Sequence, residues 1–172
     1  MIEIQQLDAN AAQIAIPELA EILHASVLQG ASIGFVQPFT IEQAADFWLR
    51  LLPAIERGER LLLVAREAGR VTGTVQLLLD MPDNGRHRAE IVKLMVHPHA
   101  RRKGIARQLM QQVELLAMAH QRQLLVLDTL SGDTAEGIYR SLGYQLAGMI
   151  PSYARASNGA SLDSTSYMYK LL

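Results

Sequence analysis

A short basic loop that contains a glycine is the segment of this sequence with the clearest chemical potential. Arg101, Arg102 and Lys103 precede Gly104, and the small residue Ala106 follows it. An amphipathic pattern begins at Gly104, so we expect the loop to open a helix, where the first amides lack helical partners and the dipole is positive. Such a site suits a phosphate, and the glycine lets the anion approach the backbone closely. The loop is not a Walker loop, because Gly-x-x-x-x-Gly-Lys-Ser/Thr is absent.

Positive charge is concentrated around this loop. Between residues 86 and 107 there are seven basic residues against the single acid Glu90, although the whole chain has a net charge of −1. A basic island on an otherwise acidic chain fits one compact anion. The alternative is a basic face that contacts only solvent. No aromatic residues are interleaved with the bases, and this disfavours nucleic acid as the partner.

Composition limits the class of protein further. The 172 residues are 49% hydrophobic and 19% charged, which suits one substantial core and excludes a disordered chain. Cysteine is absent, so disulfides, zinc ribbons and a covalent cysteine intermediate are excluded. We find no run of about 18 apolar residues that would span a membrane and no signal peptide. We therefore expect a cytoplasmic protein.

Hydrophobic periodicity predicts the elements that must position the loop. Thr40 and Gln43 form a capping-box pattern at a helix start. Pro17 is expected in the first turn of its helix or at a kink, and Pro53 is expected to bend or end the next helix. One α+β domain over residues 1–172 with a mixed sheet follows. Strands are expected at 2–7, 60–66, 71–79, 90–96, 124–127, 144–150 and 164–172, helices at 12–28, 41–53, 104–120 and 134–142, and a polar loop at 151–163.

Two motifs resemble the GCN5-related N-acetyltransferase (GNAT) family. Arg101-x-x-Gly104-x-Ala106 is similar to the family's Arg/Gln-x-x-Gly-x-Gly/Ala signature, and it follows a predicted strand as it does in the family. Ala135-x-x-x-Tyr139-x-x-x-Gly143-Tyr144 resembles the helix-to-strand motif that closes the cofactor site. The likeness covers about residues 60–150. It implies the GNAT acyltransferase fold, an α/β sandwich with a central sheet of about seven strands flanked by helices.

Further stretches resemble a family member that acetylates the amine of a small, amino-acid-like toxin. They are residues 30–35, 89–96, 107–110, 127–129 and 151–153. The resemblance implies acetyl transfer to the amine of a small molecule, such as an amino-acid-like toxin or antibiotic, by direct attack in a ternary complex. The alternative is a non-catalytic module that binds CoA as a sensor or partner subunit.

The family resemblance also implies acetyl-CoA as the co-substrate, without a metal. Acetyl-CoA is expected in a wedge between the strand ending at Val96 and the strand ending at Asp128. Its pyrophosphate would lie on the loop backbone, its pantetheine would pair with Leu94 and Val96, and the amide near Met95 would polarise the acetyl carbonyl. The expected cofactor contacts are Leu94, Met95, Val96, Arg101, Arg102, Lys103, Gly104, Ile105, Ala106 and Arg107.

Two carboxylates and a tyrosine are the expected catalytic residues. A substrate ammonium with a pKa near ~10 must lose a proton before it attacks. Glu90 and Asp128 match carboxylates suspected in the similar toxin acetyltransferase, and burial would raise the pKa of either one; which of them is the base stays open. Tyr139 matches the family tyrosine that protonates the departing thiolate. The alternatives are a Glu90 paired with Lys93 or Arg88, an Asp128 that caps a turn, and a Tyr139 that only packs.

A weaker set of residues is expected to contact the acceptor. Lys93 either meets a substrate carboxylate or extends toward solvent or Glu90, and Trp48 either lines the pocket or belongs to the core. His97 and His99 are interpreted as loop histidines, since no metal-ligand set accompanies them. We expect a small-molecule amine as partner, no nucleic acid and no membrane, with a homodimer left open. The weaker acceptor candidates are Ser32, Trp48, Lys93 and Tyr153.

Overall fold

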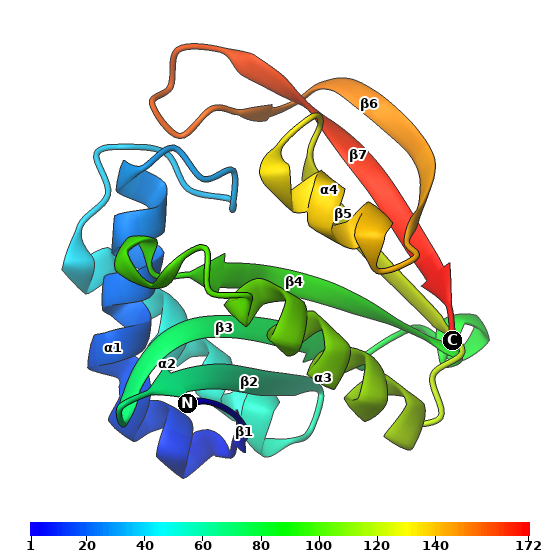
Figure 1. Ribbon diagram of the computed structural model, residues 1–172, viewed down its shortest axis with the longest axis horizontal. Helices are drawn as coiled ribbons and strands as arrows, with labels where there is room; N and C mark the ends of the chain where they lie inside the picture. Colours follow the sequence, from blue (N-terminus) through cyan, green and yellow to red (C-terminus); the bar gives the residue numbers. More distant parts are fainter.

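A computed structural model describes all residues from 1 to 172, and its framework is one seven-stranded sheet in the order β1-β2-β3-β4-β5-β7-β6 (Figure 1). Only β4 and β5 pair in parallel; the other neighbours are antiparallel. This is the predicted mixed sheet of a GNAT-type α+β fold. The strands are β1 (Ile2–Leu7), β2 (Arg60–Glu67), β3 (Arg70–Leu78), β4 (Arg88–Val96), β5 (Leu124–Leu130), β6 (Gln145–Arg155) and β7 (Leu162–Leu171).

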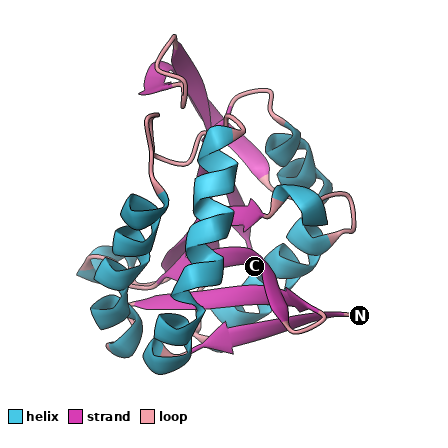
Figure 2. Ribbon diagram, turned by 90° about the vertical axis from the view of Figure 1, so that its left-hand side faces the viewer, coloured by secondary structure: helices cyan, strands magenta, loops and turns pink.

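The helices cover the two faces of the sheet, so that it lies between two cores (Figures 1 and 2). We call the cluster under α1 and α2 the α1–α2 core; it includes Leu23, Trp48 and Leu62. The cluster under α3 and α4 is the α3–α4 core, which includes Leu109 and Leu127. The helices are α1 (Ala9–Leu28), α2 (Ile41–Glu56), α3 (Ile105–Ala119) and α4 (Thr134–Ser141), with short 3-10 turns η1 (Asp83–Gly85) and η2 (Pro98–Ala100).

The capping box at the start of α2 is confirmed. The Thr40 hydroxyl accepts from the Gln43 amide at 3.2 Å, and the Gln43 side chain accepts from the Thr40 amide at 2.8 Å. Neither proline ends its helix: Pro17 lies inside α1, beyond its first turn, and Pro53 lies inside α2, which continues to Glu56. An internal proline costs about 3 kcal/mol or more, and packing of each helix against the sheet outweighs that cost.

Helix α1 has the length and hydropathy of a membrane-spanning helix, contrary to the expectation that no such run exists. It has 20 residues, and half of its most apolar 18-residue stretch is buried inside the protein. Leu19, Ile22 and Leu23 are fully buried in the α1–α2 core. The core helix of a soluble protein can have the same length and composition. The packing of α1 in the α1–α2 core identifies it as such a core helix. Ile14, also on α1, is 82% exposed.

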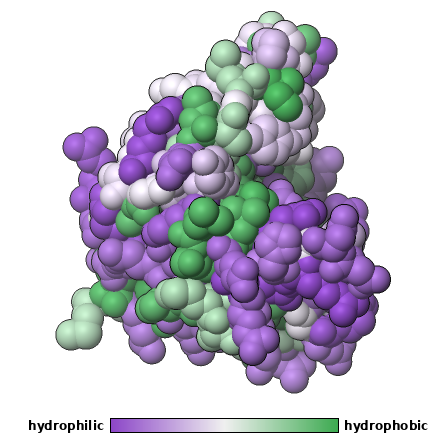
Figure 3. Space-filling view, turned by 90° about the vertical axis from the view of Figure 1, so that its right-hand side faces the viewer, coloured by the Kyte–Doolittle hydropathy of each residue, from purple (hydrophilic) through white to green (hydrophobic).

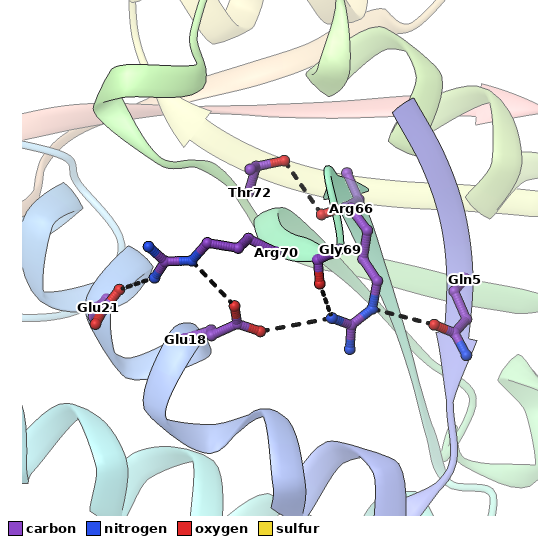
Figure 4. A network of polar contacts seen from close by, with 8 residues as sticks. Gln5, Glu18, Glu21, Arg66, Gly69, Arg70 and Thr72 are labelled. Carbon is purple, nitrogen blue, oxygen red and sulfur yellow. Dashed lines mark hydrogen bonds and ion pairs between the residues drawn. The ribbon is translucent and has the colours of Figure 1, made fainter. Parts of the chain in front are cut away.

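A polar network fastens α1 to the turn between β2 and β3 (Figure 4). Arg70 lies 3.4 Å from Glu18 and 3.1 Å from Glu21. Arg66 lies 3.6 Å from Glu18 and donates to the carbonyl of Gly69 at 2.9 Å. Because exposed ion pairs contribute at most about 1 kcal/mol each, the network serves mainly to fix the position of α1 over the sheet.

The long hairpin of β6 and β7 replaces part of the loop expected at residues 151–163. Strand β6 continues to Arg155 and β7 begins at Leu162. Pro151 is tolerated because β6 is an edge strand whose register breaks between Ile150 and Ala154. Every residue of β6 except Ala154 is exposed. Figure 3 shows one side of the molecule, where apolar side chains gather in the middle of the surface.

A glycine lets α3 lie close to the sheet. A Cβ atom on Gly73 of β3 would lie 2.9 Å from Ile105 Cγ2 and 3.1 Å from the carbonyl of Met95. Real side chains do not approach that closely, so only glycine fits at this position without movement of α3. Gly73 thereby fixes the distance from the first turn of α3 to β4.

Candidate functional site

Strands β4 and β5 separate in the middle of the sheet. Their parallel pairing is limited to Arg88–Leu124, Ala89–Leu125 and Glu90–Val126. Beyond that point β4 continues to Val96 on its β3 side only, and β5 continues to Leu130 on its β7 side only. Each strand therefore presents an unpaired inner edge to the other, and this edge can pair with an extended ligand. The expected wedge is present, although β5 ends at Leu130 and not at Asp128.

A β-bulge lies where the strands part. Thr74 pairs with Met95 and Gln76 with Val92, so Lys93 and Leu94 together face the single residue between them on β3. Lys93 adopts a φ of +56°, a left-handed conformation that is rare for a side-chain-bearing residue and that clusters at functional sites. Bulges re-aim side chains. Here Ile91 faces the α3–α4 core, whereas Met95, four residues on, faces the α1–α2 core.

The loop before α3 presents a row of free amides. The Arg101 amide donates to Pro98 at 3.4 Å, and the next backbone donor with a partner is Gln108, bonded to Gly104 at 3.1 Å. No side chain caps the helix start. Six consecutive amides, residues 102–107, therefore have no protein acceptor. Arg102 and Gly104 both have positive φ, +67° and +78°, so the backbone there curves into an anion-binding nest.

The space around these amides is open. A Cβ on Gly104 would meet nothing closer than Gln108 Nε2 at 4.0 Å, so the surface above the glycine is open. The loop lies next to the inner edge of β4, where Leu94 and Val96 are partly buried against the α3–α4 core. The arrangement therefore suits a ligand with a phosphate at one end and an extended amide-bearing arm, as CoA has.

Most of the basic side chains at the loop already have partners. Arg101 donates to the carbonyl of Val96 at 3.3 Å and to Gln29 at 3.0 Å. Lys103 forms an ion pair with Glu67 at 2.8 Å. Arg107 donates to the Ser141 hydroxyl on α4 at 2.7 Å. Arg102 is the exception, because its guanidinium forms no hydrogen bond with the protein. The Arg101 side chain donates to the Val96 carbonyl. An extended ligand that pairs with this carbonyl must therefore share it with Arg101 or displace the arginine.

Glu90 lies half-buried at the last paired position of β4. Its carboxylate forms no ion pair, so the alternative pairing with Lys93 or Arg88 is wrong. Burial raises the pKa of Glu90 above its usual value, and the charge of Asp128 raises it further, against opposing effects of Arg60, Lys93 and Arg88. A carboxylate of this kind is a stronger base than an exposed one.

Asp128 lies on β5 and, unlike Glu90, is exposed. It accepts from the Thr165 hydroxyl at 3.2 Å and caps no turn. Tyr153 and Tyr167 form a hydroxyl–hydroxyl hydrogen bond of 2.7 Å, and Tyr167 pairs across the sheet with Asp128. Hydrogen bonding to Tyr153 raises the pKa of Tyr167 to about 12. The carboxylate therefore lies beside the Tyr167 phenol, which stays protonated at neutral pH.

Tyr139 lies on α4 with its ring in the α3–α4 core and 6% of its surface exposed. Its hydroxyl makes no protein hydrogen bond, yet it is not among the fully enclosed polar atoms. Burial, followed by the charges of Asp128 and Asp133, raises the pKa of Tyr139 well above its usual value. The phenol thus stays protonated, its hydroxyl is free to donate, and Asp128 is close enough for its charge to act on it.

The weaker acceptor candidates lie in different environments. The Lys93 ammonium lies 5.9 Å from the ring centroids of both Phe35 and Phe47. Ser32 lies in the loop between α1 and α2, shortly before Phe35 in the chain, and Tyr153 lies on the edge strand. Trp48 is 1% exposed in the α1–α2 core. The core alternative therefore describes Trp48, and it lines no open surface.

Two residues of this region were not predicted from the sequence. The guanidinium of Arg60 donates to the side chain of Gln76, which is itself fully buried and has an unpartnered Nε2. Arg60, Leu78 and Glu90 occupy one row across β2, β3 and β4. The sequence does show Arg60 and Gln76 as polar residues in the otherwise apolar strands β2 and β3. Only the register of the sheet, however, places them near Glu90.

Two surface hollows lie away from the wedge. One is lined by glutamines and apolar side chains of α3, and the other by the segment 34–39 and α2. Neither brings together titratable groups of the wedge. His97 and His99 lie in and beside η2, where the His97 ring accepts from the His99 amide at 3.3 Å. No cluster of three metal-ligating side chains is found.

Known proteins with this arrangement are acetyltransferases. Residues 58–146 match the family model of the acetyltransferase (GNAT) domain, which is more than half of the chain. The ribosomal-protein-alanine N-acetyltransferase of Brucella melitensis superposes with a TM-score of 0.80 at 21% identity, covering 99% of both chains. A GCN5-related N-acetyltransferase from Kribbella flavida gives 0.80 at 22% identity, covering 99% of this chain and 98% of that one.

A third similar structure contains a ligand. It is yncA from Salmonella typhimurium with its cofactor acetyl-CoA, which superposes with a TM-score of 0.78 at 21% identity and covers 99% of this chain and 94% of its own. At these identities the superpositions establish the shared fold.

Proposed function

Since this chain belongs to the GNAT acetyltransferase family, we propose that it transfers the acetyl group of acetyl-CoA to the amine of a small molecule by direct attack in a ternary complex. The observation that carries the proposal is the row of six free amides, residues 102–107, beside the unpaired edge of β4. The chain has no cysteine for a covalent acetyl intermediate, and this supports direct transfer. When bound, acetyl-CoA supplies the thioester-activated acetyl group.

The loop and β4 are proposed to hold the co-substrate. Amides of residues 102–107 and the guanidinium of Arg102 bind the diphosphate, with Arg101, Lys103 and Arg107 adding positive charge around it. The inner edge at Leu94 and Val96 pairs with the extended arm as an added strand. The amide near Met95 donates to the acetyl oxygen, where charge develops during transfer.

Glu90 is proposed as the base that takes the proton from the substrate ammonium, directly or through water. Its raised pKa brings its basicity nearer to that of an amine than an ordinary carboxylate would be. Asp128 supports this role by placing a second negative charge on the same region of the sheet. Asp128 also attracts the ammonium group electrostatically, although Thr165 holds one of its oxygens.

Tyr139 is proposed to stabilise the departing thiolate. A thiol has a pKa near ~8.5, below that of the buried phenol, so full proton transfer from Tyr139 is uphill. A hydrogen bond from its free hydroxyl to the sulfur stabilises the developing charge without that transfer.

The remaining expectations are carried as parts of the same proposal. The sheet uses strands from Ile2 to Leu171, which supports one N-acetyltransferase domain over residues 1–172. The cytoplasm is its proposed location. The stretches that resemble the tabtoxin resistance acetyltransferase favour an amino-acid-like toxin or antibiotic as acceptor. The presence of Glu90, Asp128 and Tyr139 together in this sequence disfavours the alternative, a CoA-binding module without chemistry.

An assay of thiol release tests the proposed function. Acetyl-CoA is offered with amino acids, polyamines, aminoglycosides and peptides, and we expect release that depends on one class of small amine. Glu90→Gln and Tyr139→Phe should each reduce this release by about 10²-fold. Tight binding of acetyl-CoA with no release for any amine would leave only the binding-module alternative.

A further inference from the structure

Four charged side chains on one face of the sheet have no ion-pair partner. Arg60, Glu90, Lys93 and Asp128 come from β2, β4 and β5, and none of them is among the eight ion pairs within 4 Å that the molecule forms. Arg60, Glu90 and Lys93 are partly buried. Unpaired charge removed from water is costly, so the set is poised for a partner that carries charges of both signs.

Register and contacts place these groups on the same face. Arg60 and Glu90 share a row of the sheet, and Asp128 lies two residues beyond Val126, the partner of Glu90. The side chains of a strand alternate between faces, so Asp128, Val126 and Glu90 point to the face that carries α1 and α2. Lys93 contacts Phe35 and Phe47, which pack on that face too.

Other side chains of the protein hold the two cations in place. Arg60 is held by the buried side chain of Gln76, whose Nε2 lacks a partner, and Lys93 is placed by the bulge and rests over two aromatic rings. Both are therefore donors fixed before a ligand arrives. Burial, together with the charge of Arg60, lowers the pKa of Lys93 because both disfavour its charged form. An anionic ligand beside the ammonium would favour the charged form again.

We propose that the acceptor carries a carboxylate close to its amine, and that Arg60, held in place by Gln76, and Lys93 bind this carboxylate while Glu90 and Asp128 face the amine. This inference rests on the proposed function and narrows it to amino acids and their analogues. The balance of two cations and two anions disfavours polyamines and aminoglycosides, since their additional ammonium groups would meet Arg60 and Lys93.

Binding of a matched pair of ligands tests the inference separately from catalysis. A panel of neutral α-amino acids and the corresponding α-amino-acid amides is titrated into the protein saturated with CoA, with heat of binding as the readout. The amide keeps the amine and the side chain but loses the carboxylate. We expect at least one amino acid to bind at least about tenfold more tightly than its amide.

Variants identify the residues that cause this preference. Arg60→Gln and Lys93→Met keep the packing of the side-chain stems, and each should reduce the preference to about threefold or less. Arg57→Gln is the matched control: Arg57 is 59% exposed, pairs with Glu59 outside the wedge and should leave the preference unchanged. Melting temperatures and CoA affinity show whether each variant is folded.

Equal binding of acid and amide across the panel would overturn the inference, even if amines are acetylated. A preference that survives in both Arg60→Gln and Lys93→Met would overturn the assignment of these residues. If an amino acid binds in preference to its amide but releases no thiol from acetyl-CoA, the proposed function fails while the carboxylate site stands.

Discussion

Glu90 and Val126 are the last residues at which β4 and β5 pair. The sheet opens directly beyond them, with the bulge of β4 at Lys93 on one side and Asp128 on the other. The half-buried base candidate therefore sits at the apex of an opening whose far end leads to the free amides before α3. One structural feature, the end of a parallel ladder, positions both the proposed proton acceptor and the proposed co-substrate site.

Replacing Gly104 should weaken co-substrate binding. Gly104→Leu puts a side chain over the free amides and strains a position with φ +78°, so we expect acetyl-CoA affinity to fall at least about tenfold, the loss of one charge-assisted contact. Gly58→Leu is the control, because Gly58 also has positive φ, +70°, and open space around it but lies outside the loop. Calorimetry that shows equal affinity for the two variants would contradict the loop assignment.

The basic side chains of the loop should contribute unequally. Arg102 makes no protein contact, whereas Lys103 must leave Glu67 before it can meet a phosphate. We therefore expect Arg102→Met to reduce acetyl-CoA affinity several-fold more than Lys103→Met does, and the difference to shrink as salt is raised from ~50 to 500 mM. A larger loss of acetyl-CoA affinity in Lys103→Met would contradict this prediction. It would mean that Lys103 leaves Glu67 without a free-energy cost.

The pH dependence of acetyl transfer should report Glu90. The carboxylate must be deprotonated to act, so the rate falls as pH falls through its pKa. Burial and Asp128 raise that pKa, opposed by Arg60, Lys93 and Arg88, and the acidic limb should lie above the range of an exposed glutamate. Asp128→Asn removes the like charge and should move the limb to lower pH.

The control for this prediction is Glu90→Gln, which should abolish the limb together with most of the rate. An unchanged limb in Glu90→Gln, or complete inactivity of Asp128→Asn with normal acceptor binding, would identify Asp128 as the base.

Tyr139 and Tyr144 provide a matched pair of phenols. Their rings lie 5.9 Å apart in the same core, but the Tyr144 hydroxyl is fully enclosed and that of Tyr139 is not. Tyr139→Phe should lower kcat by about 10²-fold with unchanged acetyl-CoA affinity, whereas Tyr144→Phe should leave kcat unchanged. Equal rates for the two variants in a thiol-release assay would remove Tyr139 from the mechanism.

Local signals predicted most of the fold, because they depend on short spacings. The capping box at Thr40 and Gln43 and the alternation in β1 are examples. The hairpin of β6 and β7 was underestimated, since Pro151 and the polar residues after it are typical of loops. Only the edge position of β6 makes them compatible with a strand.

The site was predicted in part. Gly104 and the free amides follow from a local pattern, but the end of the β4–β5 ladder depends on register, which no short window contains. Arg60 and Gln76 were missed for that reason: they are 16 residues apart and meet only through strand pairing. Trp48 shows the converse, because helical spacing alone does not separate a pocket residue from a core residue.

The most direct test of the central claim is a crystal structure of the protein with acetyl-CoA. We expect the diphosphate oxygens to lie within about 3.2 Å of amide nitrogens from residues 102–107, with the extended arm paired to the inner edge of β4 and the acetyl group beside Glu90. A ligand bound elsewhere, with those amides bonded only to water, would contradict the account.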